Sequence, residues 1–202
     1  MKLKIYDETY QYHNEISVLE DVFKKINDMI EQSDEFFSHL EVDQVEVYEN
    51  HDAYLVEHIA TVEEITVIMK TKIEILIETI QTTEVYLTGA LPEVEALSEA
   101  FYQNPTEQTW DTFGQLVEGM NWLIQLVQSI KQIDLEVPYM EEYVESLTTM
   151  ESELPTLLEA VENKDAILIA DVIHYEVLPA WQQLKSTATK TIDEIGTRPE
   201  AN

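Results

Sequence analysis

The stretch from Ala53 to Thr88, AYLVEHIATVEEITVIMKTKIEILIETIQTTEVYLT, decides the fold that the sequence predicts. It contains no Gly, Pro, Asn or Asp, so no common turn residue interrupts it. Further isoleucines make its apolar face wider than a narrow coiled-coil seam, so a helix here needs partners on more than one side. We therefore predict one long helix at the centre of a bundle. Its apolar positions recur at helical spacing and are Ile59, Val62, Met69, Ile73, Leu76, Ile80 and Leu87.

A β interpretation of the same stretch competes with the helix. Ile73, Ile75 and Ile77 alternate with Glu74 and Glu78, and β-branched side chains favour strands. Strands usually run for about 4–8 residues between turn signals, and this stretch is far longer. Asp52 is placed to cap the start of a helix and Gly89 to end it. These features favour the helix.

The N-terminal part of the chain predicts a small β element beside one helix. Residues 2–6 alternate polar and apolar side chains like a short strand, and residues 9–32 carry apolar side chains at helical spacing. Residues 39–48 alternate on both sides of Asp43 and Gln44, which indicates a hairpin with a tight turn there, or else one extended strand. Because a hairpin alone is marginally stable, we expect the strand at 2–6 to pair with it.

The C-terminal part predicts further helices with short connections. Pro92 is expected to bend the chain and to open a new helix over residues 92–103. Thr106 then caps the start of another helix. Gly114 and Gly119 lie inside that helix, where each glycine costs about 1 kcal/mol relative to alanine. We expect one of them to permit close contact with a neighbouring helix.

Together these elements predict a mainly α protein, an antiparallel bundle of about four to five helices with a small N-terminal β element made of a short strand plus a hairpin. The predicted domain division is a small α/β element over residues 1–50, packed on a helical bundle over residues 51–196. Residues 197–202 are expected to form a frayed tail.

The charge of the chain limits which partners it can bind. Its 41 acidic and 11 basic residues give a formal net charge of −30, spread along the whole sequence. Nucleic-acid binding is disfavoured because phosphate contacts need Lys and Arg, and anionic lipid surfaces would repel the chain. The charge fits either a solvated surface, adapted to a salty or alkaline habitat, or a surface that docks a basic protein.

The chain contains no cysteine, which excludes disulfides, thiolate nucleophiles and Cys-based metal sites. Its first residues lack the apolar core of a signal peptide. No run of about 18 uncharged apolar residues suggests a membrane span. The expected location is therefore the cytoplasm.

Motifs for chemistry are weak. None of the five histidines forms an HExxH zinc motif. Asp171 and His174 are three residues apart with Glu176 close by, which makes these three residues the best candidates for a metal site in a helical bundle. Such a site needs further ligands from other helices. There is no Gly-rich phosphate loop and no nucleophile elbow, so we expect no catalytic residue, no cofactor and no enzymatic activity.

The three tryptophans, Trp110, Trp122 and Trp181, lie in the predicted helical region. Core packing is the usual role of such side chains, whereas an exposed tryptophan beside a groove marks an interface.

The sequence thus favours a non-enzymatic protein-interaction module, like the acidic helical bundles that serve as chaperones or adaptors in bacteria. Its partner would be another protein or a second copy of the chain. The alternative is a bundle that binds a metal or a small ligand.

Overall fold

The computed structural model describes residues 1–196, and these divide into two compact units. The first unit is Met1–Ile75 and the second begins at Leu76. The sequence had predicted a boundary at residues 50 and 51. The frayed tail predicted at 197–202 lies outside the described residues.

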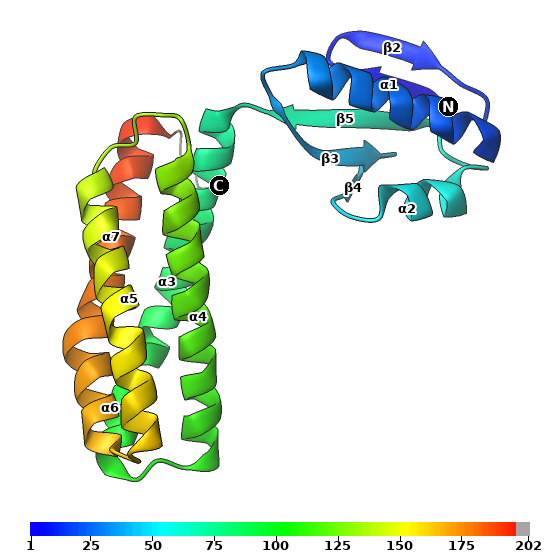
Figure 1. Ribbon diagram of the computed structural model, residues 1–202. Coiled ribbons are helices and arrows are strands. Elements are labelled where there is room, and N and C mark those ends of the chain that lie inside the picture. The colour runs from blue at the N-terminus through cyan, green and yellow to red at the C-terminus, as the bar shows by residue number, and fades with distance from the viewer. Residues whose placement is uncertain (197–202) are drawn as a thin grey trace, which may run out of the picture. The chain divides into compact units, whose positions relative to one another are not determined.

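A five-stranded mixed sheet forms the first unit, with strand order β2-β1-β5-β3-β4 (Figure 1). Strand β1 is antiparallel to β2 and parallel to β5, and β3 is antiparallel to both β5 and β4. The elements of the unit are β1 (Lys2–Ile5), β2 (Glu8–Gln11), a 3-10 turn (Ile16–Val18), α1 (Leu19–Gln32), β3 (Phe36–Val42), β4 (Val45–Val47), α2 (His51–His58) and β5 (Glu64–Lys70).

The sheet has its own hydrophobic core, formed by alternate residues of its strands together with α1 and α2. Leu3 and Ile5 of β1 are buried, as the sequence predicted for residues 2–6. Ile65 and Val67 of β5 are buried beside them, in register with Leu3 and Ile5. The period of two along both strands places these side chains on one face of the sheet.

The fold class predicted from the sequence is therefore wrong, because the protein is mixed α/β and its sheet is more than a short strand plus a hairpin. The single helix predicted over 53–88 is instead α2, the central strand β5 and the start of α3. The prediction failed because the connection from α2 to β5 is built without Gly, Pro, Asn or Asp. The stretch therefore lacked the signals that mark a turn.

Three smaller predictions about the first unit have different outcomes. Asp43 and Gln44 both have positive φ and join β3 to β4, which confirms the hairpin. The helix predicted over 9–32 is wrong in its first part, where β2 and a 3-10 turn precede α1. The strand at residues 2–6 pairs with β2 and β5 and not with the hairpin.

Four long helical segments form the second unit and alternate in direction (Figure 1). The last segment is one continuous run in which a π-helical turn separates α6 from α7. Pro92 lies inside an unbroken α3, so the new helix predicted to begin there is wrong. The elements are α3 (Lys72–Gln103), α4 (Glu107–Gln132), α5 (Met140–Glu162), α6 (Ala166–Val172), the π turn (Ile173–Val177) and α7 (Leu178–Ile195).

Local sequence explains where these helices start. The Thr106 hydroxyl accepts a hydrogen bond from the Thr109 N–H at 3.3 Å, which confirms Thr106 as the cap of α4. Thr71 and Glu74 form a reciprocal pair of hydrogen bonds at the start of α3. The Glu74 carboxylate accepts a bond from the Thr71 N–H at 2.8 Å, and the Thr71 hydroxyl accepts one from the Glu74 N–H at 3.3 Å. The bonds from Thr71 lower the pKa of Glu74.

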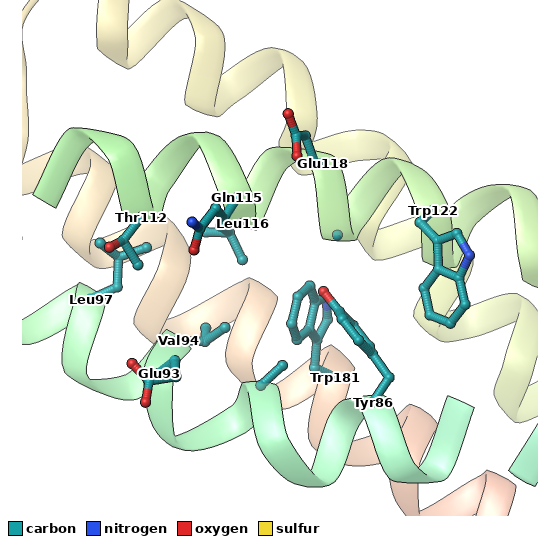
Figure 2. A pocket seen from close by; sticks show the side chains of 12 residues that line it. Tyr86, Glu93, Val94, Leu97, Thr112, Gln115, Leu116, Glu118, Trp122 and Trp181 are labelled. Carbon is teal, nitrogen blue, oxygen red and sulfur yellow. The ribbon is translucent and has the colours of Figure 1, made fainter. Parts of the chain in front are cut away.

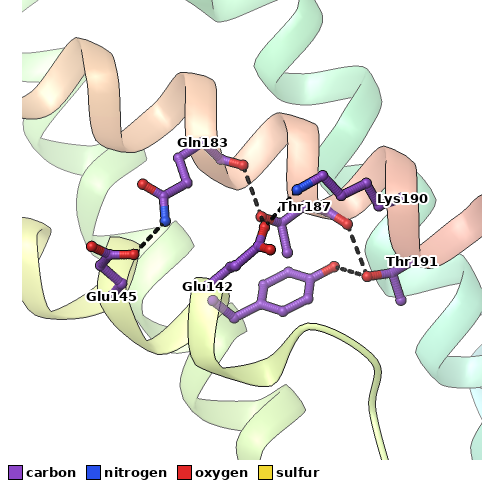
Figure 3. Close-up of polar contacts among 7 residues, drawn as sticks. Glu142, Glu145, Gln183, Thr187, Lys190 and Thr191 are labelled. Carbon is purple, nitrogen blue, oxygen red and sulfur yellow. Dashed lines mark hydrogen bonds and ion pairs between the residues drawn. The ribbon is translucent and has the colours of Figure 1, made fainter.

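A polar cluster joins α5 to α7 (Figure 3). The buried Tyr143 hydroxyl donates to Thr191 Oγ1 at 3.1 Å, and burial raises the pKa of Tyr143 to about 12. Nearby, the Glu142 carboxylate accepts from Lys190 and from Thr187, each at 2.9 Å. The Lys190 and Thr187 hydrogen bonds lower the pKa of Glu142. This cluster fixes the register of the two helices.

Replacing Tyr143 with Phe is expected to lower the free energy of unfolding of the bundle by about 1 kcal/mol. The substitution removes one buried hydrogen bond but keeps the ring in the core. Thr191 retains its own bond to the Thr187 carbonyl at 2.8 Å. Urea unfolding followed by tryptophan fluorescence measures the change, and an unchanged midpoint would show that the bond contributes nothing to stability.

Candidate functional site

The candidate site is a groove between α3 and α4, with a volume of about 440 Å³. Close backbone contacts join α4 to α5 and α5 to α7, whereas α3 lies farther from α4. Figure 2 shows the side chains that line the space between these helices. The lining residues are Tyr86, Ala90, Glu93, Val94 and Leu97 from α3, Thr112, Gln115, Leu116, Glu118, Gly119 and Trp122 from α4, and Trp181 from α7.

Three aromatic rings form one end of the groove. The Tyr86 and Trp122 rings meet edge to face, with centroids 4.9 Å apart. The Tyr86 and Trp181 centroids are 6.0 Å apart. Trp181 is buried with 1% of its surface exposed, while 38% of the Trp122 surface is exposed. The aromatic end therefore has a fixed floor, Trp181, and an accessible wall, Trp122.

The charged residues that line the groove are both acidic. Glu93 of α3 and Glu118 of α4 lie on opposite sides of it, and both are exposed. No lining residue is basic. The side chains between the two carboxylates are mostly apolar, among them Val94 and Leu116, which are buried. This arrangement suits a ligand that is apolar on one side and positively charged at its edges.

Gly119 gives the groove its depth at the aromatic end. A Cβ atom at this position would overlap the Tyr86 hydroxyl and lie 3.2 Å from the Trp181 ring. Gly114 has no such neighbour within 4 Å. Gly119 therefore leaves room for the side chains of Tyr86 and Trp181. The sequence had predicted close contact between two helices at one of the glycines, whereas the contact at Gly119 is with side chains.

The residues predicted as metal ligands lie elsewhere in the bundle. Asp171 lies near the C-terminal part of α3. Its carboxylate accepts a hydrogen bond from the Tyr102 hydroxyl at 2.5 Å. This bond raises the pKa of Tyr102 to about 12. His174 Nδ1 lies 3.5 Å from the Ser98 hydroxyl, and Glu176 is exposed. Within residues 1–196, no three His, Asp or Glu side chains are grouped so that they could hold a metal ion.

A π turn over Ile173–Val177 contains two of these candidates, His174 and Glu176. Leu178 donates its N–H to the Ile173 carbonyl, five residues back. Pro179 follows and has no N–H to donate, so the usual hydrogen bond to the Tyr175 carbonyl cannot form. The wider turn accommodates this proline.

A comparison with protein families matches residues 78–187, more than half of the chain, to the family described as a domain of unknown function (DUF8042). The chain belongs to this family. No curated protein and no solved structure matches the chain.

The DUF8042 segment contains every residue that lines the groove, from Tyr86 to Trp181. It ends before the last turns of α7 and does not include the sheet unit. Among residues 1–196, no helix has the length and apolar character that a membrane span requires.

Sequence reasoning missed most of the DUF8042 groove. It assigned the apolar positions of α4 to a core-facing stripe, and Leu116 is indeed buried there. It gave core packing as the usual role of Trp122 and expected close helix contact at Gly114 or Gly119, and it did not group Gln115, Gly119 and Trp122 as one site. The only local signal of the groove in the sequence was Trp122, three residues after Gly119. The wide spacing of α3 and α4, which makes the groove, has no counterpart in the sequence.

Proposed function

We propose that the groove between α3 and α4 binds the apolar face of a positively charged amphipathic helix from a partner protein. The protein would act without catalysis, as a chaperone-like or adaptor-like module in the cytoplasm. The observation that carries the proposal is an apolar, aromatic groove with a carboxylate on each side and no basic residue. Helix-in-groove recognition uses apolar anchors at helical spacing on the bound segment.

The dimensions of the groove support a helical ligand. Its lining residues on α3 run from Tyr86 to Leu97, which spans about 16 Å at about 1.5 Å per residue. A bound helix of about three turns would cover this length. Its apolar face would contact Trp122 and Leu116, and its Lys or Arg side chains would reach Glu93 and Glu118.

Net charge favours a foreign partner over a second copy. Each chain carries a formal charge of −30, so two copies repel each other, whereas a basic partner is attracted. Self-association through the groove would also place carboxylates against an acidic surface. A basic helix gains both the apolar contact and the charge complementarity.

A fluorescent amphipathic model helix made of Leu and Lys, about 18 residues long, tests the proposal by anisotropy. We expect saturable binding that weakens about 2- to 10-fold when Glu93→Gln and Glu118→Gln are combined, because each exposed charge pair contributes up to about 1 kcal/mol. The matched control combines Glu159→Gln with Glu162→Gln, two exposed positions on α5 that lose the same charge away from the groove.

If both double variants bind the model helix with equally weakened affinity, the proposal is contradicted, since binding then depends on net charge alone. No binding to the wild-type chain at low salt would also contradict it.

A small apolar ligand is the second candidate. The volume of about 440 Å³ lies within the range of small-molecule sites. Displacement of the bound model helix by a small hydrophobic amine, but not by a small hydrophobic acid, would favour this alternative.

A further inference from the structure

Tyr86 reaches from α3 across the aromatic end of the groove. Its hydroxyl occupies the space directly over Gly119, where any side chain would overlap it. Its ring lies between Trp122 and Trp181, as Figure 2 shows. Among residues 1–196, the Tyr86 hydroxyl has no hydrogen-bond partner. The side chain is therefore held by ring packing alone.

The indole N–H of Trp181 also lacks a partner within the described part of the chain. The side chain is almost completely buried, with 1% of its surface exposed. A buried donor without an acceptor is unfavourable, and most native structures avoid it. Because this nitrogen is covered, an acceptor from outside can reach it only after a neighbouring side chain has moved.

We infer that Tyr86 fills the groove in the free protein, and that the bound helix displaces it and places a neutral carbonyl oxygen on the Trp181 N–H. This inference rests on the proposed function and adds the chemistry of the partner's anchor. Tyr86 is the side chain that lies against Trp181 without a hydrogen bond to hold it. The vacated space takes one large apolar side chain of the partner.

The acceptor is neutral because Glu93, Glu118 and the overall negative charge oppose an anion. An amphipathic helix supplies such acceptors, since its last four backbone carbonyls have no partner within the helix. The partner class is therefore a basic helix that presents a bulky apolar residue near an unpaired carbonyl.

Two variants separate these roles in titrations of the full chain with the Leu/Lys model helix. Tyr86→Ala removes the competing side chain, so we expect affinity to rise several-fold. Trp181→Phe removes the N–H and keeps an aromatic floor. We expect several-fold weaker binding. Because the smaller ring also leaves a void in the core, the unfolding midpoint is recorded to show that the variant remains folded at the temperature of the titration. Val85→Ala, an exposed position on α3 outside the groove, is the control.

The indole N–H resonance of Trp181 gives a second readout in the ¹⁵N-labelled chain. We expect it to move downfield on saturation with the model helix. If the wild-type chain binds the helix but Tyr86→Ala binds more weakly and the Trp181 resonance does not move, the inference is overturned and the proposed function stands. If neither the wild type nor Tyr86→Ala binds, both are overturned.

Discussion

Replacing Ile65 with Asn is expected to destabilise the sheet unit by about 4 kcal/mol and to leave the helical bundle folded. Ile65 is 0% exposed on β5, the strand between β1 and β3. The substitution removes apolar contacts and buries an amide that has no partner in the core. A loss of this size is a large part of the stability of a small unit.

The fluorescence of the chain makes the two units separable. All three tryptophans, Trp110, Trp122 and Trp181, lie in the bundle, so their emission reports on that unit alone. Far-UV circular dichroism reports on both units. We expect the Ile65→Asn variant to show an early transition by dichroism and an unchanged transition by fluorescence.

Thr66→Asn is the matched control, since this half-buried side chain points to the opposite face of the same strand. A small effect at residue 66 beside a large effect at residue 65 is the signature of a strand. A fluorescence midpoint that falls as far as the dichroism midpoint in Ile65→Asn would contradict the independence of the two units.

Replacing Trp181 with Ala is expected to destabilise the bundle by about 3–5 kcal/mol, because it leaves a large cavity beneath the groove. The side chain is 1% exposed and packs against the bundle core. Trp122→Ala is the control: the residue is the same, but 38% of its surface is exposed, so less packing is lost. Urea unfolding followed by circular dichroism compares the two, since the fluorophore itself is changed. Equal losses would contradict the assignment of Trp181 as the floor and Trp122 as the accessible wall.

Local signals in the sequence were reliable where a few neighbouring residues determine the structure. Leu3 and Ile5 correctly predicted β1, Asp43 and Gln44 predicted the hairpin, and Thr106 predicted the start of α4. Each depends on the period of a strand, the φ angles of a tight turn or the capping of a helix. None of them requires knowledge of what packs against the element.

The central error concerned β5, where local signals were ambiguous. Ile73 and Ile75 flank Glu74 and yet are helical, while Ile65 and Val67 flank Thr66 and form a strand. The difference comes from tertiary structure, since β5 is buried between two strands distant in sequence. The capping pair Thr71 and Glu74, visible in the sequence, marks the start of α3 and would have divided the stretch.

The candidate site was harder to predict than the fold. The sequence did point to tryptophans as interface candidates, and Trp122 is exposed beside the groove. It also singled out the two glycines inside α4, and one of them, Gly119, leaves room for the Tyr86 side chain. The groove itself depends on the distance between α3 and α4, which is set by the bulk of side chains from three helices. No pattern along a single segment reports such a distance.

Amide NMR of the ¹⁵N-labelled full chain, titrated with the Leu/Lys model helix, tests the central claim most directly. We predict saturable shifts confined to residues 86–97 of α3 and 112–122 of α4, together with the Trp181 indole signal. Shifts scattered over acidic residues of both units, shifts centred on the sheet, or no shifts at all would contradict the claim that this groove is the binding site.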